Sequence, residues 1–470
     1  MTFNSIEFLI LFPTLLLGFY AMPHRLRWSL LLVGSLIFYV WLIPSYLFVA
    51  SYIVLSSYAL ALFIKRAKPS TKKHWLFVSV VLSLIPLFTF KYFNFVNENL
   101  ATFSEVIGWN YSQASLKLIL PLGISFQTFQ ALSYLIEVYQ ERIEPELHLG
   151  IYSLYILFFP QLVAGPIERP QNLLPQFRKE AFFEPAHFNN GLRLMLWGFF
   201  KKVVIADRMA SLPNEIFVNP SEFSTIYLLP ATLCFAIQIY CDFSGYSDIA
   251  RGIGQTFGIQ LMKNFEQPYL ARNPVDFWRR WHISLSTWFR DYLYFPLGGN
   301  RSSRLTHFRN LFIVFVVSGL WHGANWTFVV WGAFHGMGII LYLIYSQSGA
   351  QKYFPVFSRP WVGTALTFSM VTVGWVFFRA NSVSEALYVL THLFDFSTIG
   401  TEPVWGKSTL MISLAGLIVL FIGDYLIEKK LEPKFFELAV PVRWGVYWAT
   451  ALCIMNLGTV ENVAFIYFQF

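Results

Sequence analysis

Long apolar runs separated by short polar or basic loops cover almost the whole chain. A helix that crosses a bilayer needs about 20 consecutive, mostly apolar residues. Candidate runs lie at 5–21, 29–44, 46–64, 75–90, 115–139, 150–165, 191–206, 225–250, 310–345, 361–379, 408–427 and 443–460. This pattern predicts an all-α, polytopic transmembrane protein with about 11–13 membrane segments, some of them re-entrant.

Two stretches interrupt the pattern. The segment 165–184 is too polar for a simple crossing, and we expect a re-entrant or interfacial element there, because non-helical backbone at membrane depth must be covered by protein or line a wet cavity. The segment 268–309 is long and rich in Trp and Arg, so protein or the membrane interface must cover it. No internal repeat is visible, and a single membrane domain, residues 1–470, is the simplest organisation.

The run Asn310–Tyr345 is nearly twice as long as one crossing requires, and basic residues flank it on both sides. Basic loops mark the cytoplasmic face of a membrane protein. The run is therefore predicted to enter and leave from that face as a hairpin, with its turn near Gly323–Asn325. The same rule, applied to the basic loops near both ends of the chain, places the N-terminus and the C-terminus outside the cytoplasm.

Composition agrees with membrane insertion. The chain is 56% hydrophobic and only 13% charged, about half the charged fraction of an ordinary soluble domain. The net charge of +8 comes from basic residues in short loops, which is typical of charges that fix the orientation of a protein in membrane lipid and not of nucleic-acid binding. The three cysteines form no CxxC pattern, and neither a disulfide framework nor a metal site is expected.

His322 is the strongest candidate for chemistry. If its helix starts near Asn310, a rise of 1.5 Å per residue places the imidazole roughly 18 Å into a hydrocarbon core of about 30 Å. An ionisable side chain at that depth is costly, which favours function over a hydrogen-bonded core histidine. A histidine can accept a proton from a hydroxyl and return one to a thiolate. His335 has a similar setting, and spacing alone does not exclude it.

A second group of candidates precedes this run. His282 lies in a stretch dense in Trp, Arg and Ser, where it is favoured as a functional residue. Trp278 and Arg279 can equally belong to an interfacial belt. The candidate hydrogen-bond donors to a substrate or an oxyanion are Trp278, Arg279, Ser284 and Asn325.

Four short segments appear in an order that resembles a known family. They are Pro121–Phe126 (PLGISF), Pro160–Ile167 (PQLVAGPI), the run Phe277–Gly299 and Gly319–Gly323 (GLWHG). Together they resemble the membrane-bound O-acyltransferase family, in its bacterial alginate O-acetylation branch. The resemblance extends over nearly the whole chain.

This resemblance implies several properties. His322 would be the catalytic histidine and His282 a second functional polar residue. A central funnel would admit an acyl thioester from the cytoplasm, either acetyl-CoA or a carrier-protein thioester. No permanently bound cofactor and no metal are implied. His282 or nearby donors would stabilise an oxyanion.

The branch also implies a setting and partners. Its members lie in the bacterial inner membrane and pass an acetyl group to a separate periplasmic acetyltransferase that modifies an exported polysaccharide, alongside other polysaccharide-export proteins. The aromatic C-terminal tail resembles one in which a central tyrosine, here Tyr467, relays the acyl group. The alternative is that the tail only anchors the chain at the interface.

Two other functions are weighed against acyl transfer. A transporter or flippase for a lipid-linked sugar would also place His and Arg in the membrane, but no inverted repeat is visible. A noncatalytic scaffold for polysaccharide assembly would need His322 only for stability.

Overall fold

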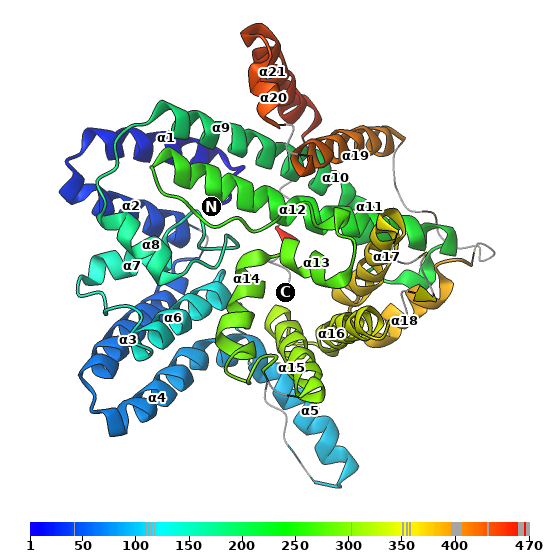
Figure 1. The fold of residues 1–470 in the computed structure, drawn as a ribbon, viewed down its shortest axis with the longest axis horizontal. Coiled ribbons are helices and arrows are strands. Elements are labelled where there is room, and N and C mark those ends of the chain that lie inside the picture. Colours follow the sequence, from blue (N-terminus) through cyan, green and yellow to red (C-terminus); the bar gives the residue numbers. More distant parts are fainter. Residues whose placement is uncertain are drawn as a thin grey trace. The chain divides into compact units, whose positions relative to one another are not determined.

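Helices make up every regular element of the described chain (Figure 1). The structure is a computed structural model that describes residues 1–470 except 42, 110, 112–114, 117, 302, 350–351, 354–355, 357–358, 396–401, 403–406, 430–431, 459–464 and 467–470. The expected all-α class is therefore confirmed.

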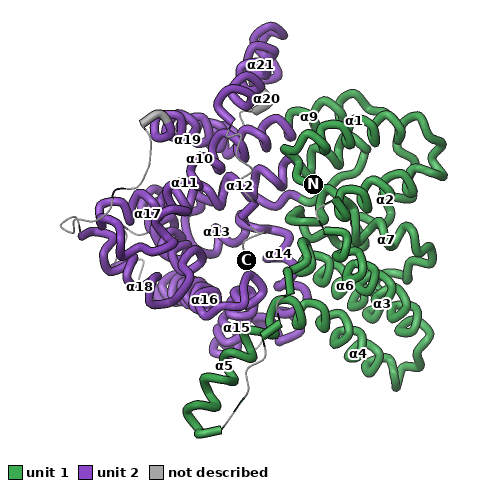
Figure 2. Tube along the Cα trace, turned by 180° about the vertical axis from the view of Figure 1, so that it is seen from behind, with its two compact units in different colours: residues 1–193, 250–262 green, residues 194–249, 263–470 purple. Residues whose placement is uncertain are grey.

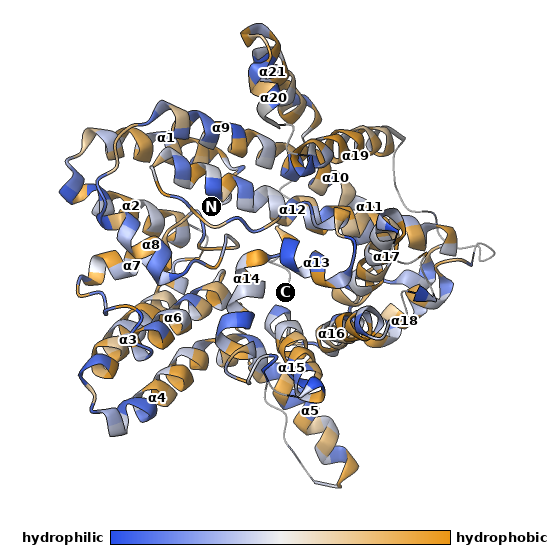
Figure 3. Cartoon of the chain, in the orientation of Figure 1, coloured by the Kyte–Doolittle hydropathy of each residue, from blue (hydrophilic) through white to orange (hydrophobic). Residues whose placement is uncertain are grey.

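Six of the described helical segments are long and apolar enough to cross a membrane. They are Tyr46–Arg66, Pro69–Val106, Thr225–Thr256, Trp326–Gln347, Pro360–Arg379 and Thr409–Glu428. Figure 3 shows hydrophobic residues along α3, α4 and α16 and hydrophilic ones on α13. These segments confirm a polytopic membrane protein. The larger number of crossings counted from sequence stays a prediction.

The chain divides into two compact units, which Figure 2 distinguishes by colour. Unit 1 comprises Met1–Arg193 and Ala250–Met262, and unit 2 comprises Leu194–Ile249 and Lys263–Phe470. Unit 1 contains α1 (Ile6–Ala21), α2 (His24–Val40), α3 (Tyr46–Arg66), α4 (Pro69–Leu87), the π-helical η1 (Phe88–Tyr92), α5 (Phe93–Val106), α6 (Ile124–Tyr139), α7 (Leu149–Leu157), α8 (Pro170–Arg178) and most of α9 (Pro185–Phe199).

Two of the four quoted motifs meet inside unit 1. Gly123 precedes α6 in a left-handed conformation, with φ of 75°. A Cβ atom there would overlap the carbonyl oxygen of Leu162, so the two backbones lie in direct contact. The helix expected over 150–165 ends at Leu157, since the chain turns at Phe158 just before Pro160. The segment 165–184 contains only the short α8, in keeping with an element that does not span.

Unit 2 holds the remaining helices. They are η2 (Phe200–Ala206), α10 (Asp207–Met209), α11 (Ser211–Ile216), η3 (Pro220–Glu222), η4 (Thr225–Tyr227), most of α12 (Leu228–Thr256), η5 (Pro268–Leu270), α13 (Pro274–Arg280), α14 (Ile283–Phe289), η6 (Arg290–Tyr294), α15 (Arg304–His322), α16 (Trp326–Gln347), α17 (Pro360–Arg379), α18 (Val383–His392), α19 (Lys407–Glu428), α20 (Glu432–Glu437) and α21 (Val440–Leu457). The polar stretch 268–309 thus contains the short helices η5, α13, α14 and η6 and the first turns of α15, and its described residues form no crossing of their own.

α15 and α16 form the predicted hairpin, with the turn at Gly323–Asn325. α15 begins at Arg304, six residues before the expected start. A Cβ atom at Gly319 would overlap the carbonyl oxygen of Phe328, and one at Gly332 would overlap that of Phe315. The two helices therefore pack backbone to backbone, which fixes the position of the residues at the turn.

Candidate functional site

His322 is the last residue of α15 and lies directly before the hairpin turn. Its side chain is 5% exposed. Aromatic rings surround the imidazole: the ring centroids of Trp321, Trp331 and Phe378 lie 4.9, 5.0 and 5.3 Å away. The rigid hairpin and this aromatic shell together hold the ring in place.

His282 is fully buried and lies between α13 and α14, in a left-handed conformation with φ 44° and ψ 54°. Its Nδ1 atom is 3.2 Å from the side-chain oxygen of Asn264. The ring of Phe243, on α12, meets it edge-on at 4.6 Å. Burial lowers the pKa of His282 from 6.5 to about 3, although a hydrogen bond with its own backbone acts in the opposite direction. The imidazole is therefore neutral at physiological pH.

The structure brings these two histidines together. Their ring centroids lie 6.4 Å apart, with an angle of 58° between the planes. At this separation one hydroxyl oxygen can lie within hydrogen-bond reach of both rings. The corner between α13 and α14 and the turn between α15 and α16 therefore build one polar centre in an aromatic environment.

His335 lies farther from this centre. It is fully buried on α16, and Trp331 lies between it and His322, with centroid distances of 5.0 Å to each. Neither of its ring nitrogens has a hydrogen-bond partner among the described residues. The ring instead packs on Trp278, 5.1 Å away, and on the backbone of Gly374.

A cavity of about 600 Å³ opens within unit 2 among α13, α14, η6, α15 and α16. Most of its lining is apolar, and Arg279, Arg290 and His307 add basic groups. Ser318 also lines it and lies one helical turn before His322 on α15. The cavity therefore extends to within one turn of the histidine pair.

The predicted donors divide into two pairs. Trp278, which is buried, and Arg279, which is exposed, both line the cavity. Ser284 is buried beside His282 and donates its backbone N–H and its hydroxyl to Asn264, at 3.1 and 2.9 Å. Asn325 caps α16, accepting from the backbone N–H of Thr327 at 3.0 Å and donating to the carbonyl of Asn381 at 3.0 Å. Tyr467 lies outside the described residues.

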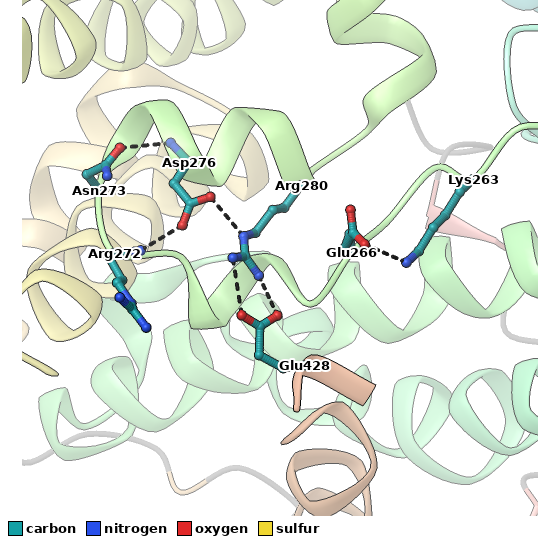
Figure 4. Close-up of polar contacts among 7 residues, drawn as sticks. All are labelled: Lys263, Glu266, Arg272, Asn273, Asp276, Arg280 and Glu428. Carbon is teal, nitrogen blue, oxygen red and sulfur yellow. Dashed lines mark hydrogen bonds and ion pairs between the residues drawn. The ribbon is translucent and has the colours of Figure 1, made fainter. Parts of the chain in front are cut away.

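Arg280 fixes the helix that leads to His282 (Figure 4). Its Nε donates to Asp276 at 2.9 Å on the same helix, and its Nη1 donates to Glu428 at 2.7 Å, at the end of α19. Asn273 caps the helix by accepting from the backbone N–H of Asp276 at 2.8 Å. This network was not predicted from the sequence.

A second unpredicted cluster holds Phe465 and Ile466. Asp242 on α12 pairs with Lys202 at 2.7 Å and accepts from the backbone N–H of Ile466, also at 2.7 Å. Ile466 is fully buried, and the ring of Phe465 lies 6.1 Å from that of Phe243, the same ring that contacts His282. The described part of the C-terminal tail is therefore anchored one ring away from the histidine pair.

In the described part of the chain, no three His, Cys, Asp or Glu residues cluster in a way that could hold a metal ion. The fold and the site together define an integral membrane protein with a buried histidine pair at the head of a helical hairpin.

The chain belongs to the membrane-bound O-acyltransferase family, whose model matches residues 146–384. It is 35% identical to a probable alginate O-acetylase of Pseudomonas putida, covering 100% of both chains. It is 36% identical to a peptidoglycan O-acetyltransferase of Helicobacter pylori, over 83% of this chain and 79% of the relative. A teichoic acid D-alanyltransferase of Bacillus subtilis is 26% identical, over 64% of this chain and 77% of the relative.

Family membership makes this chain a membrane-bound acyltransferase. It confirms the resemblance read from the four motifs and decides against the transporter and scaffold alternatives. The matched segment includes Asn264, His282, His322 and His335.

Proposed function

We propose that this acyltransferase takes an acetyl group from a cytoplasmic thioester, acetyl-CoA, and delivers it across the bacterial inner membrane for O-acetylation of an exported polysaccharide such as alginate. The observation that carries the proposal is the buried pair His282–His322, with 6.4 Å between ring centroids, in a member of an acyltransferase family. Alginate is favoured as the acceptor because the alginate O-acetylase matches over the full length of both chains.

His322 acts as the general base in this reaction. It accepts the proton of the attacking hydroxyl while the hydroxyl oxygen bonds to the thioester carbon. The carbon–sulfur bond then breaks, and the proton passes to the departing thiolate, so that an ester and a free thiol result. A proton transfer of this kind by a positioned side chain contributes about 10²–10⁴-fold to the rate.

The cavity beside α15 is suited to the donor. Its apolar walls fit a flexible thioester arm, and Arg279 and Arg290 can pair with the phosphates of coenzyme A. Because the basic flanks of the hairpin are expected at the cytoplasmic face, the donor enters from that side. Trp278 borders both the cavity and the aromatic group around His335.

The C-terminal tail then receives the acetyl group from the thioester. Tyr467 forms the acyl ester and passes the group to a periplasmic acetyltransferase partner, with both chain termini on the periplasmic side. The buried anchor at Phe465 and Ile466 supports this role, because these two residues directly precede Tyr467 in the sequence and lie one ring away from the histidine pair. An aryl ester keeps much of the transfer potential of a thioester, since the pKa of a phenol, about 10, is near that of a thiol, about 8.5.

The test is thiol release from acetyl-CoA by the purified protein in lipid nanodiscs, with the partner and polymer supplied. We expect His322→Gln to lower the rate about 10²–10⁴-fold. His335→Gln is the matched control, a buried histidine on the same hairpin, and should keep the wild-type rate. A normally folded His322→Gln variant with wild-type activity would overturn the assignment of the base. Labelled acetyl should be retained on the wild-type protein and not on the Tyr467→Phe variant. Absence of labelled acetyl from the wild-type protein would contradict the relay.

A further inference from the structure

Asn264 lies at the centre of the hydrogen bonds around His282. It is 1% exposed. Its side-chain oxygen accepts from the backbone N–H and the hydroxyl of Ser284, and the same oxygen lies 3.2 Å from Nδ1 of His282. Its backbone carbonyl accepts from the N–H of Ile283 at 2.9 Å, and its amide nitrogen is 3.4 Å from the hydroxyl of Ser247 on α12. One residue therefore joins α12 to the corner that carries the histidine.

These contacts fix which end of the Asn264 amide is the oxygen. A backbone N–H can only donate, so the atom that meets the N–H of Ser284 must be an acceptor. This removes the usual ambiguity between oxygen and nitrogen in an asparagine side chain. An amide oxygen cannot donate either. The ring nitrogen that meets it, Nδ1 of His282, must therefore carry the proton.

A neutral imidazole carries one N–H, and burial keeps His282 neutral because it lowers the pKa of the ring to about 3. With the proton on Nδ1, the other nitrogen, Nε2, has a lone pair and no hydrogen. Such a nitrogen accepts a hydrogen bond or a proton and has nothing to donate to an oxyanion.

We propose that Asn264 is a positioning residue that holds His282 in the Nδ1–H tautomer, so that His282 acts in acyl transfer as a hydrogen-bond acceptor and not as an oxyanion donor. This inference rests on the proposed function for its catalytic meaning. The natural donor to Nε2 is a ring N–H of His322, directly or through one water, because the attacking hydroxyl gives its single proton to His322. An acceptor placed in this way orients the general base, as the third member of a catalytic triad does.

Asn264 is the side chain whose oxygen meets Nδ1 of His282, and a hydrogen bond with the backbone of His282 itself acts on the same ring. Phe243 faces the ring from α12, and Phe265 follows Asn264 in the chain and lies 6.4 Å from the ring. From α15 the facing groups are Trp321 and His322, at 6.1 and 6.4 Å. Among these neighbours, His322 is the titratable one.

Two variants separate positioning from mere structural support. Asn264→Asp keeps an oxygen acceptor but adds a negative charge beside the ring, which favours imidazolium. Its acidic limb in a plot of kcat/KM against pH should move up by about one unit or more. Asn264→Leu has a similar size and no acceptor, and its kcat should fall about 10²-fold or more while KM for the thioester stays near the wild-type value. Asn273→Asp, which keeps a good helix cap, is the matched control and should leave the pH profile unchanged.

The tautomer itself can be measured without any turnover. Solid-state NMR of protein labelled with ¹⁵N-histidine, in lipid, should contain one neutral ring with Nδ1 protonated and Nε2 bare, and this signal should disappear in His282→Asn. Finding His282 protonated on Nε2, or a pH profile of Asn264→Asp that superimposes on the wild type, would overturn the proposal. An inactive wild-type protein with the Nδ1–H signal in place would instead count against the proposed acyl transfer alone.

Discussion

The guanidinium of Arg280 donates two hydrogen bonds to the carboxylate of Glu428, from Nη1 at 2.7 Å and from Nη2 at 3.3 Å. The two residues are 148 positions apart in the chain, and both side chains are partly buried. Because His282 follows Arg280 by two residues, this pair connects the end of α19 with the corner that carries His282 (Figure 4).

Loss of this pair should loosen the corner. We expect Arg280→Met to lower the free energy of unfolding by about 3 kcal/mol, since it leaves the carboxylates of Asp276 and Glu428 without their partner. Arg280→Lys should recover only part of the loss, because an ammonium cannot make the planar two-point contact. Unfolding in a denaturing detergent titration measures both.

A double-mutant cycle with Glu428→Gln isolates the pair. The combined variant should lose less stability than the sum of the two single variants, by about 0.5–3 kcal/mol. Additive losses would mean that the two side chains do not interact, contrary to the geometry.

The backbone contact between α15 and α16 makes a second prediction. Gly319→Ala places a methyl group onto the carbonyl oxygen of Phe328 and should destabilise the protein by about 2 kcal/mol or more, with a parallel loss of activity. Gly445→Ala on α21 is the control, because nothing lies within 4 Å of a Cβ atom there. Thermal unfolding of both variants, followed by tryptophan fluorescence, compares them. Equal midpoints would contradict the close helix contact.

The tail anchor can be tested through a buried position. Ile466→Cys places a thiol at a fully buried site whose N–H is held by Asp242. Adding Asp242→Asn removes the charge that also pairs with Lys202, so labelling of the thiol by a maleimide should accelerate at least about tenfold, the equivalent of 1.4 kcal/mol. Asp291→Asn, at a half-exposed pair with Arg290, is the control and should leave the rate unchanged.

Burial of neutral His282 predicts a loss of stability in acid. The folded-state pKa, about 3, lies below the ordinary value of 6.5, so the unfolded chain binds the proton more readily. The contribution is fully present above pH 6.5 and is lost progressively as the pH falls toward 3. As the pH falls from 6.5 toward 3, the free energy of unfolding of the wild type should therefore decrease more than that of His282→Asn. A difference that does not change with pH would contradict a buried, neutral ring.

Sequence reasoning reached the hairpin and its turn because charge and hydropathy are local signals. Asn310–Tyr345 has basic flanks, and Gly323–Asn325 is the polar break within it. The same reasoning named His282 and His322 but could not place them together, because the corner between α13 and α14 has no periodic pattern. The helix expected over 150–165 was too long, since the break at Phe158 depends on a backbone turn that hydropathy does not record.

The residues that support the site could not be predicted from local sequence patterns. Asn264 acts on a histidine 18 positions later, and Asp242 on a backbone group 224 positions later. Asp242 does leave one local signal, because it and Asp248 are the two carboxylates within the apolar run 225–250. Such a residue in a membrane segment is expected to have a partner. Which partner it has is a matter of tertiary structure.

The backbone at His282 limits what evolution can place there. Its left-handed conformation is costly for most residues and is adopted most readily by glycine, asparagine, aspartate and histidine. The side-chain oxygen of Asn264 further requires a side chain that can donate a hydrogen bond from an atom close to the backbone. Few residues satisfy both demands, and asparagine is the nearest substitute for histidine. Distant relatives should therefore have either histidine or asparagine at this position. β-branched side chains should be absent, because the left-handed backbone conformation alone disfavours them.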